Sequence, residues 1–364
     1  MCRESNANRK RQSFSGESIA QRKRQKAAER DETVAKCDFF EALPDDLVLS
    51  ILCKLSSSAG SPADLISVMI TCKRMKSLGV NSMVLAKASK EALTVKAGNW
   101  SENAHRFLKL CSDSGNVEAC YILGMIRFYC LKNRAGGASL MAKAAMKSHA
   151  ASLYSLAVIQ FNGSGGSKTN KDLRAGAALC ARASFLGHID ALRELGHCLQ
   201  DGYGVRQNIV EGRRFLVQAN ARELAAVLNS QPGGWSAAAV GTAAVAADSP
   251  PSQLLSDFGC DVPPPEVHAA NKFLTEWFAA RGGDLGGGLR MCSHEGCGRP
   301  ETRNHEFRRC SVCGIVNYCS RACQALDWKL RHKAACVPPE RWNIDIAAVD
   351  GGNDFVADNV VEQS

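Results

Sequence analysis

Seven cysteines are crowded into residues 292–336 together with His332, and this cluster constrains the fold more than any other feature of the chain. Their spacing is Cys292-x4-Cys297-x12-Cys310-x2-Cys313-x5-Cys319-x3-Cys323-x8-His332-x3-Cys336. Such a set of eight suffices for two tetrahedral zinc sites with four protein ligands each, which leave no open position for water. We therefore expect two structural zinc ions, whose binding energy is folding energy for this segment.

Three pairs have the spacing of ligands that a tight turn or one helix face directs at a single metal: Cys310 with Cys313, Cys319 with Cys323, and His332 with Cys336. Spacing alone does not decide which pairs share an ion, because consecutive and interleaved filling are both allowed.

Disulfide bonds between these cysteines are the alternative to zinc binding. The chain starts with MCRESNANRKRQ, which is too polar and basic for a secretory signal. We therefore expect reduced thiols, in the cytosol or the nucleus.

The stretch YCSRACQALDWKLRHKAAC, residues 318–336, resembles the MYND finger, and all eight ligand positions match that family. We place the finger at residues 291–337. The resemblance implies interleaved pairing, with these two ligand sets: Cys292, Cys297, Cys319 and Cys323 for one zinc, and Cys310, Cys313, His332 and Cys336 for the other. It also implies a module that binds short, often proline-containing peptides through Ser320, Gln324 and Trp328. Packing of Trp328 against the zinc core is the alternative.

Residues 97–228 carry a helical pattern that recurs three times. Similar segments begin at Gly115, Ser148 and Gly187, and their marker leucines are 33 and 39 residues apart. A small residue recurs in the second helix of each copy: Ala144, Ala183 and Ala219. Constant offsets around a variable loop predict helical hairpins, which must stack because none can bury its apolar face alone. The pattern resembles SEL-like repeats of the tetratricopeptide type, which implies an α-solenoid that binds proteins on its concave face. A helical spacer is the alternative.

Residues 38–80 predict a compact helical unit. Pro44 suits the start of a helix, and the apolar side chains that follow it recur at helical spacing. Ser61 is placed to cap a second helix, with Pro62 in its first position. About 40 residues make a poor independent core, so this unit needs a partner or the adjoining repeats.

The same residues resemble an F-box through four pairs: Leu43-Pro44, Ile51-Leu52, Asp64-Leu65 and Cys72-Lys73. The resemblance implies docking to a Skp-family adaptor and, through it, to a cullin-RING ubiquitin ligase. The expected adaptor-binding residues are Leu43, Pro44, Leu47, Ile51, Leu52 and Leu65. An ordinary helical cap on the solenoid is the alternative.

Three other segments differ in composition from these modules. Residues 1–36 are polar and basic and predict a disordered tail; within it, Arg9–Arg11 and Arg22–Lys26 resemble a bipartite nuclear import signal. Residues 229–290 are rich in Gly, Ala and Pro, and predict a flexible linker with one short helix near residues 271–280. Residues 338–364 predict a solvated acidic tail.

The formal net charge of +9 is partly offset by metal-bound thiolates, and no aromatic residue lies within either N-terminal basic cluster, so we expect no direct nucleic-acid binding. No apolar run approaches the ~18 residues that span a bilayer. An enzyme of the MYND-linked methyltransferase type is disfavoured, because no SET-type segment is found and Asn304-His305 falls inside the finger.

The predicted fold is therefore mainly α-helical: F-box helices, a solenoid, a linker and a zinc finger. This order resembles a family of plant F-box proteins. It implies a non-catalytic adaptor subunit of an SCF-type ubiquitin ligase, whose repeats and finger bind protein substrates, in the nucleus or the cytoplasm with the nucleus favoured. The alternative is a nuclear MYND scaffold that acts in transcription or signalling without ubiquitin.

Overall fold

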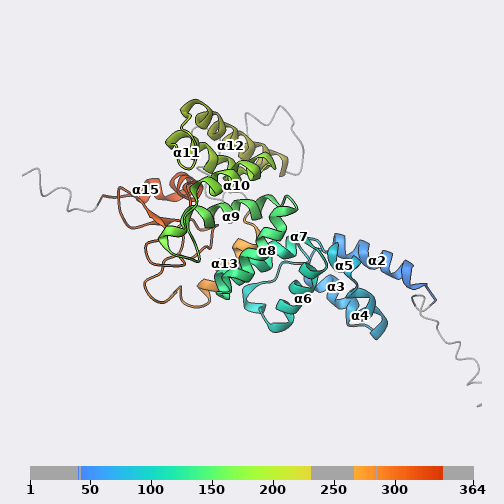
Figure 1. The fold of residues 1–364 in the computed structure, drawn as a ribbon. Helices are drawn as coiled ribbons and strands as arrows, with labels where there is room; N and C mark the ends of the chain where they lie inside the picture. Colours follow the sequence, from blue (N-terminus) through green and yellow to red (C-terminus); the bar gives the residue numbers. More distant parts are fainter. Residues whose placement is uncertain (1–39, 41, 231–265, 284, 339–364) are drawn as a thin grey trace, which may run out of the picture. The chain divides into compact units, whose positions relative to one another are not determined.

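The computed structural model describes residues 40, 42–230, 266–283 and 285–338. The predicted basic tail, the acidic tail after residue 338 and most of the predicted linker lie outside these residues. The chain divides into two compact units, Met1–Ile51 and Leu52–Ser364. The fold is mainly helical, as predicted (Figure 1). Within the described ranges, no helix is both long and apolar enough to cross a membrane.

The first unit contains the beginning of helix α2 (Asp45–Ser58). The carbonyl of Pro44 accepts a hydrogen bond from the amide of Leu47 at 3.1 Å, so Pro44 closes the first turn from the position just before the helix. Asp45 and Asp46 lie in that first turn, where their carboxylates interact favourably with the positive end of the helix dipole.

The second unit continues with three short helices: α3 (Pro62–Met69), α4 (Lys73–Gly79) and α5 (Ser82–Ala86). Ser61 precedes α3 as its N-cap, as predicted, and the Asp64 carboxylate accepts hydrogen bonds from the backbone amides of Gly60 and Ser61. This capping fixes the start of a helix whose core residue, Leu65, is fully buried.

The solenoid consists of seven helices that pack in succession: α6 (Glu102–Asp113), α7 (Val117–Met125), α8 (Arg134–Met146), α9 (Ala150–Asn162), α10 (Leu173–Phe185), α11 (Ile189–Asp201) and α12 (Ile209–Ser230). Two short turns lie between them: η2 (Ile126–Cys130), which is π-helical, and η3 (Lys168–Asn170). The predicted hairpin repeats are therefore confirmed, and α6 adds one helix before the first recognised copy.

The repeat residues that define the pattern have identifiable structural tasks. Gly163 and Gly202 end α9 and α11 with φ of +63° and +68°, a conformation that glycine adopts without strain. A Cβ atom on Gly137 would lie 2.7 Å from the carbonyl oxygen of Gly124, so this glycine lets α8 cross closely over α7. The recurring alanines of the second helices are fully buried.

The short turn η1 (Ala97–Asn99) precedes the repeats. The remaining elements form the finger and the segment before it: α13 (Ala269–Ala279), β1 (Arg308–Arg309), β2 (Asn317–Tyr318), α14 (Arg321–Asp327), the π-helical turn η6 (Trp328–His332) and α15 (Lys333–Ala335). Strands β1 and β2 pair antiparallel and make the only sheet among the described residues. In Figure 1, α13 (orange) and the finger (red) lie against the green repeats.

Helix α13 is packed on the repeats and does not behave as part of a linker. The Trp100 ring meets Phe273 and Trp277 of α13 edge-on, at centroid distances of 5.3 and 6.4 Å. The Glu276 carboxylate accepts a hydrogen bond from the amide of Ala97 at 3.0 Å. The helix expected near residues 271–280 is confirmed, but the prediction of a flexible linker is wrong for this described part of residues 229–290.

A half-buried carboxylate also holds the start of α13. Glu118 lies 2.9 Å from His149 Nε2 and 3.0 Å from His268 Nε2, the residue that caps α13. Burial alone would raise the pKa of Glu118, but hydrogen bonds from His149 and His268 outweigh it and lower the pKa from 4.5 to about 2. Because this pKa is depressed in the folded state, the carboxylate stabilises the fold above pH 4.5, and this contribution disappears as the pH falls towards 2.

Candidate functional site

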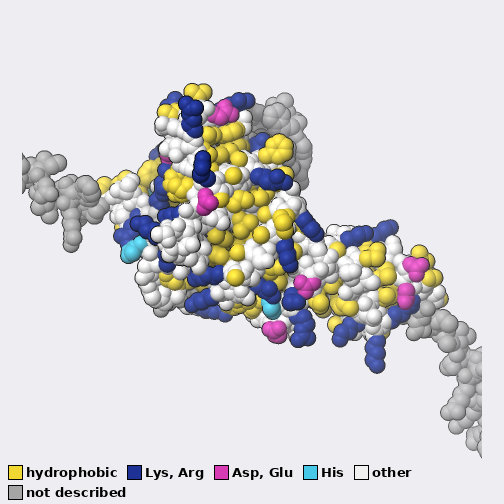
Figure 2. All heavy atoms as spheres, in the orientation of Figure 1, with side chains coloured by type: hydrophobic (Ala, Val, Ile, Leu, Met, Phe, Trp, Pro, Cys, Tyr) yellow, Lys and Arg dark blue, Asp and Glu magenta, His cyan; other side chains and the backbone are white. Residues whose placement is uncertain are grey.

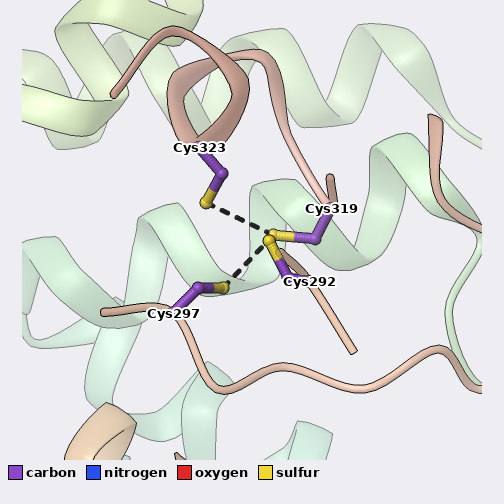
Figure 3. Close-up of side chains that lie close together, drawn as sticks. All are labelled: Cys292, Cys297, Cys319 and Cys323. Carbon is purple, nitrogen blue, oxygen red and sulfur yellow. Dashed lines mark hydrogen bonds between the residues drawn. The ribbon is translucent and has the colours of Figure 1, made fainter. Parts of the chain in front are cut away.

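The first ligand set gathers four cysteines from three parts of the finger (Figure 3). Cys292 and Cys297 lie on the loop that opens the finger, Cys319 follows β2, and Cys323 lies in the first turn of α14. All four are at most 6% exposed. The sulfur of Cys319 lies 3.5 Å from that of Cys297 and 3.6 Å from that of Cys323.

The second set joins the loop after β1 to the helical turns η6 and α15 at the end of the finger. The sulfurs of Cys310 and Cys336 are 3.8 Å apart, and Cys313 Sγ lies 3.5 Å from His332 Nε2. In each set, all four ligand atoms lie within 4.8 Å of one another. The structure thus groups the eight ligands in the interleaved manner that the MYND resemblance implied.

These distances fit tetrahedral zinc. A Zn–S bond of about 2.3 Å places two sulfurs of a tetrahedron roughly 3.8 Å apart, close to the separations in both sets. They are far longer than the ~2.05 Å of a disulfide bond, and the described cysteines are all free. Four protein ligands fill each coordination sphere, so both zinc ions are structural.

The first zinc set belongs to the same core as the repeats. Its four cysteines share one cluster of buried side chains with Tyr154 and Phe161 of α9 and with Leu195 of α11. No ligand of the second set belongs to that cluster. The finger is therefore attached through its first zinc site, and this joint was not predicted from the sequence.

Arg299 links the first zinc set to the repeats. Its guanidinium donates to Cys297 Sγ at 3.4 Å and to Ser155 Oγ at 2.9 Å, and the residue is only 4% exposed. Within the described part of the chain, no carboxylate forms an ion pair with it. A buried guanidinium requires a negative partner, and four thiolates around one Zn²⁺ provide the excess negative charge.

The pKa of Arg299 agrees with this assignment. Burial alone would lower the pKa, but the negative charge of Cys297 and Cys319 outweighs burial and holds it above its ordinary value. Arg299 is thus the counter-charge of the first zinc set, supplied at the surface where the finger meets α9.

Further polar contacts complete this joint. The Asn162 side chain donates to the carbonyl of Cys319 at 2.7 Å, and Tyr154 and Ser320 hydroxyls lie 3.1 Å apart. The buried Glu194 carboxylate accepts the Ala322 amide at 2.8 Å, at the start of α14. Burial raises the pKa of Glu194, and the Ala322 amide counteracts that effect.

The residues that join the finger to the repeats were not identified from the sequence, but two of them carried a signal in it. Ser155 and Glu194 occupy the same position of the second and third repeat copies, where the first copy has Ile122. All three are buried. A polar residue at an inward repeat position must find a partner, and here each of the two has a partner in the finger.

The predicted peptide-binding residues have different surroundings. The Ser320 hydroxyl accepts the Cys323 amide and contacts Tyr154, and the residue is 8% exposed, so it faces the repeats. Gln324 is half-buried, and Trp328 is 38% exposed with its ring 5.7 Å from His332. Peptide binding by Gln324 and Trp328 stays a prediction.

A groove of about 930 Å³ remains beside the finger. It runs between α13, the finger and the N-terminal ends of α9 and α11, and its walls include Tyr154, His188, Asp190 and Arg331. The inner side of the repeats, where the resemblance placed a protein-binding face, is therefore partly occupied by the finger.

The predicted adaptor-binding residues divide into two groups. Leu47 and Ile51, one turn apart on α2, are 52% and 43% exposed, Pro44 is also exposed and Leu43 is half-buried. By contrast, Leu52 and Leu65 are 2% and 0% exposed. These two side chains lie in the core of the protein's own fold, and adaptor binding by all six residues stays a prediction.

Comparison with known proteins supports the modular interpretation. Residues 90–192 match the family model of plant tetratrico peptide repeats, and residues 292–336 match that of the MYND finger. F-box protein At1g67340 of Arabidopsis thaliana is 66% identical over 332 residues, which cover 88% of this chain and 86% of that protein. The chain belongs to this family of F-box proteins.

Two further proteins are similar to this chain. A second protein of this family, F-box protein At5g50450 of the same plant, is 58% identical over 318 residues, covering 87% of this chain and 91% of its own. Among solved structures, the Sel1 repeat protein from Oxalobacter formigenes is 23% identical, covers 32% of this chain and 86% of its own, and has a TM-score of 0.29. The solenoid is established by its stacked helices and not by this last likeness.

Proposed function

We propose that this protein is the substrate-recognition adaptor of an SCF-type ubiquitin ligase and has no catalytic role of its own. In this proposal the N-terminal helices bind a Skp-family adaptor, which connects to a cullin, and the repeats and finger bind the protein target. The observation that carries it is the family: two relatives of almost full length are named F-box proteins. The exposed pair Leu47 and Ile51 supplies an apolar surface for the adaptor.

Replacing Leu47 and Ile51 together with alanine should abolish capture of a Skp-family adaptor. Each side chain is about half exposed, so the fold should be retained, while two apolar anchors of an interface are worth about 2–4 kcal/mol, or roughly 30-fold or more in affinity. The measurement is a pull-down with purified adaptor, followed by titration calorimetry.

The matched control is Lys54→Ala, an exposed change on the same helix. It should bind the adaptor as the wild type does. No binding by the wild type, or equal binding by the double variant, would refute the ligase proposal.

Target binding is proposed for two surfaces of the second unit, Trp328 with Gln324 and the groove beside α13. The alternative function, a nuclear scaffold without ubiquitin, uses the same surfaces. It predicts that Trp328→Ala loses partners while the Leu47 and Ile51 double variant keeps them all. Nuclear import through Arg9–Arg11 and Arg22–Lys26 belongs to both proposals, and a fluorescent fusion that stays nuclear after replacement of both clusters would exclude it.

A further inference from the structure

The outer helices of the repeats expose apolar side chains that no described part of the chain covers. We call the exposed side chains of α8, α10 and α12 the outer face. Four large apolar residues on it are 60% to 89% exposed: Met146 (78%), Phe185 (89%), Val210 (80%) and Val217 (60%). Figure 2 shows hydrophobic side chains gathered over the stacked helices α8 to α12, with Lys and Arg beside them.

Two hydrogen bonds connect successive helices of the outer face. Met146 and Phe185 are equivalent, since each follows the buried alanine of its second helix by two residues. Arg182 donates from α10 to Ser148 Oγ, just after α8, at 3.3 Å, and Arg222 donates from α12 to the carbonyl of Ser184 in α10 at 3.3 Å. These bonds link the end of α8 to α10 and the end of α10 to α12, so Met146 and Phe185, which lie at those two ends, are on the same side of the repeats.

The outer face carries an excess of positive charge. Helices α8 and α10 contain no acidic residue, and they and α12 carry exposed basic residues between the apolar ones: Lys143, Arg174, Arg182, Arg213, Arg214 and Arg222. Of the two acids on α12, Glu211 lies 3.5 Å from Arg214, and Glu223 is buried against Arg193 at 2.6 Å. The surface thus combines unpaired positive charge with exposed apolar groups.

We propose that the outer face binds an acidic, amphipathic segment of a partner protein. The partner's apolar face would remove the exposed apolar side chains from water, and its carboxylates would pair with the interleaved Lys and Arg side chains. Nucleic acid fits less well, because its phosphates satisfy the basic residues and leave Met146, Phe185 and Val217 exposed. This inference goes beyond the ligase proposal and does not depend on the N-terminal helices.

The test uses the full, zinc-loaded chain and fluorescence anisotropy with three labelled probes. The first is an 18-residue helical peptide, on the order of five turns, with leucines on one face and glutamates elsewhere. The second has lysine in place of each glutamate, and the third is a scrambled version of the first. The first probe should bind at least tenfold more tightly than either of the others.

Two pairs of changes separate the apolar and charged contributions. One double variant combines Met146→Ala with Phe185→Ala, and the other combines Lys143→Glu with Arg213→Glu. Each should weaken binding of the acidic peptide about tenfold or more. These four side chains are exposed, so thermal unfolding and adaptor capture should not change. Ile315→Ala, at a 78% exposed position on the finger, is the control and should bind as the wild type does.

Equal binding of the three peptides, or affinity unaffected by either pair of changes, would overturn the proposal. So would tighter binding of duplex DNA or of anionic vesicles than of the acidic peptide at the same salt concentration. Failure here leaves adaptor capture intact, so it is distinguishable from failure of the ligase proposal.

Discussion

Replacing Cys297 with serine should unfold the finger and destabilise the repeats with it. The change removes a ligand of the first zinc set, which shares a buried core with α9 and α11. Structural zinc contributes on the order of 10 kcal/mol to folding of such modules, so most of the finger's stability is lost. We expect the melting temperature of the whole second unit to fall by about 10 °C or more, measured by calorimetry.

The matched variant is Cys336→Ser, which removes a ligand of the second set. That cysteine is half-buried and its set lies outside the shared core. We expect zinc loss and local unfolding of the finger's end, but a much smaller change in melting of the repeats. Equal effects of the two variants on the repeats would contradict the asymmetry between the sites.

Replacing Arg299 with methionine should be the second most damaging single change. It keeps all eight zinc ligands and a similar side-chain length, but it leaves the first zinc set without its counter-charge in a buried setting. Breaking a buried ion pair in this way costs about 3–5 kcal/mol. The expected results are a lower melting temperature and faster transfer of one zinc ion to a chelator.

Two variants distinguish a charge effect from a general loss of packing. Arg299→Lys keeps the positive charge and should restore part of the stability and the slow zinc release, although lysine cannot make both hydrogen bonds at once. Arg309→Met, at an exposed arginine of β1, should be neutral. If Arg299→Lys were as unstable as Arg299→Met and released zinc equally fast, charge compensation would not be the role of Arg299.

The features that followed from the sequence are those with local or periodic signals. Ligand spacing revealed the eight metal-binding positions, and the MYND resemblance supplied their pairing. The recurrence of a small residue at Ala144, Ala183 and Ala219 predicted the hairpin repeats, because a close helix crossing restricts the residue type at one position.

The joint between finger and repeats lacked such a signal. Arg299 and Ser155 are 144 residues apart, and Glu194 and Ala322 are 128 apart, so no local pattern relates them. The Gly-rich composition before the finger favoured a linker, whereas α13 packs through Phe273 and Trp277. A polar residue at an inward repeat position was the one available indication, and its partner was not identifiable.

The adaptor-binding prediction illustrates another limit. Leu47, Ile51, Leu52 and Leu65 all fit the apolar pattern of short amphipathic helices, and a pattern does not state which side chains face the unit's own core. Only the folded structure separates Leu52 and Leu65, which are buried, from Leu47 and Ile51, which are exposed.

The most direct test of whether the metal holds finger and repeats in one core is amide hydrogen exchange in α9 and α11. It is measured before and after a chelator removes zinc. We predict that amides of both helices, distant in sequence from every ligand, lose protection when zinc is removed, because the shared core opens. Unchanged protection in α9 and α11 after complete zinc removal would show that the finger is only an appendage of the solenoid, and would contradict this account.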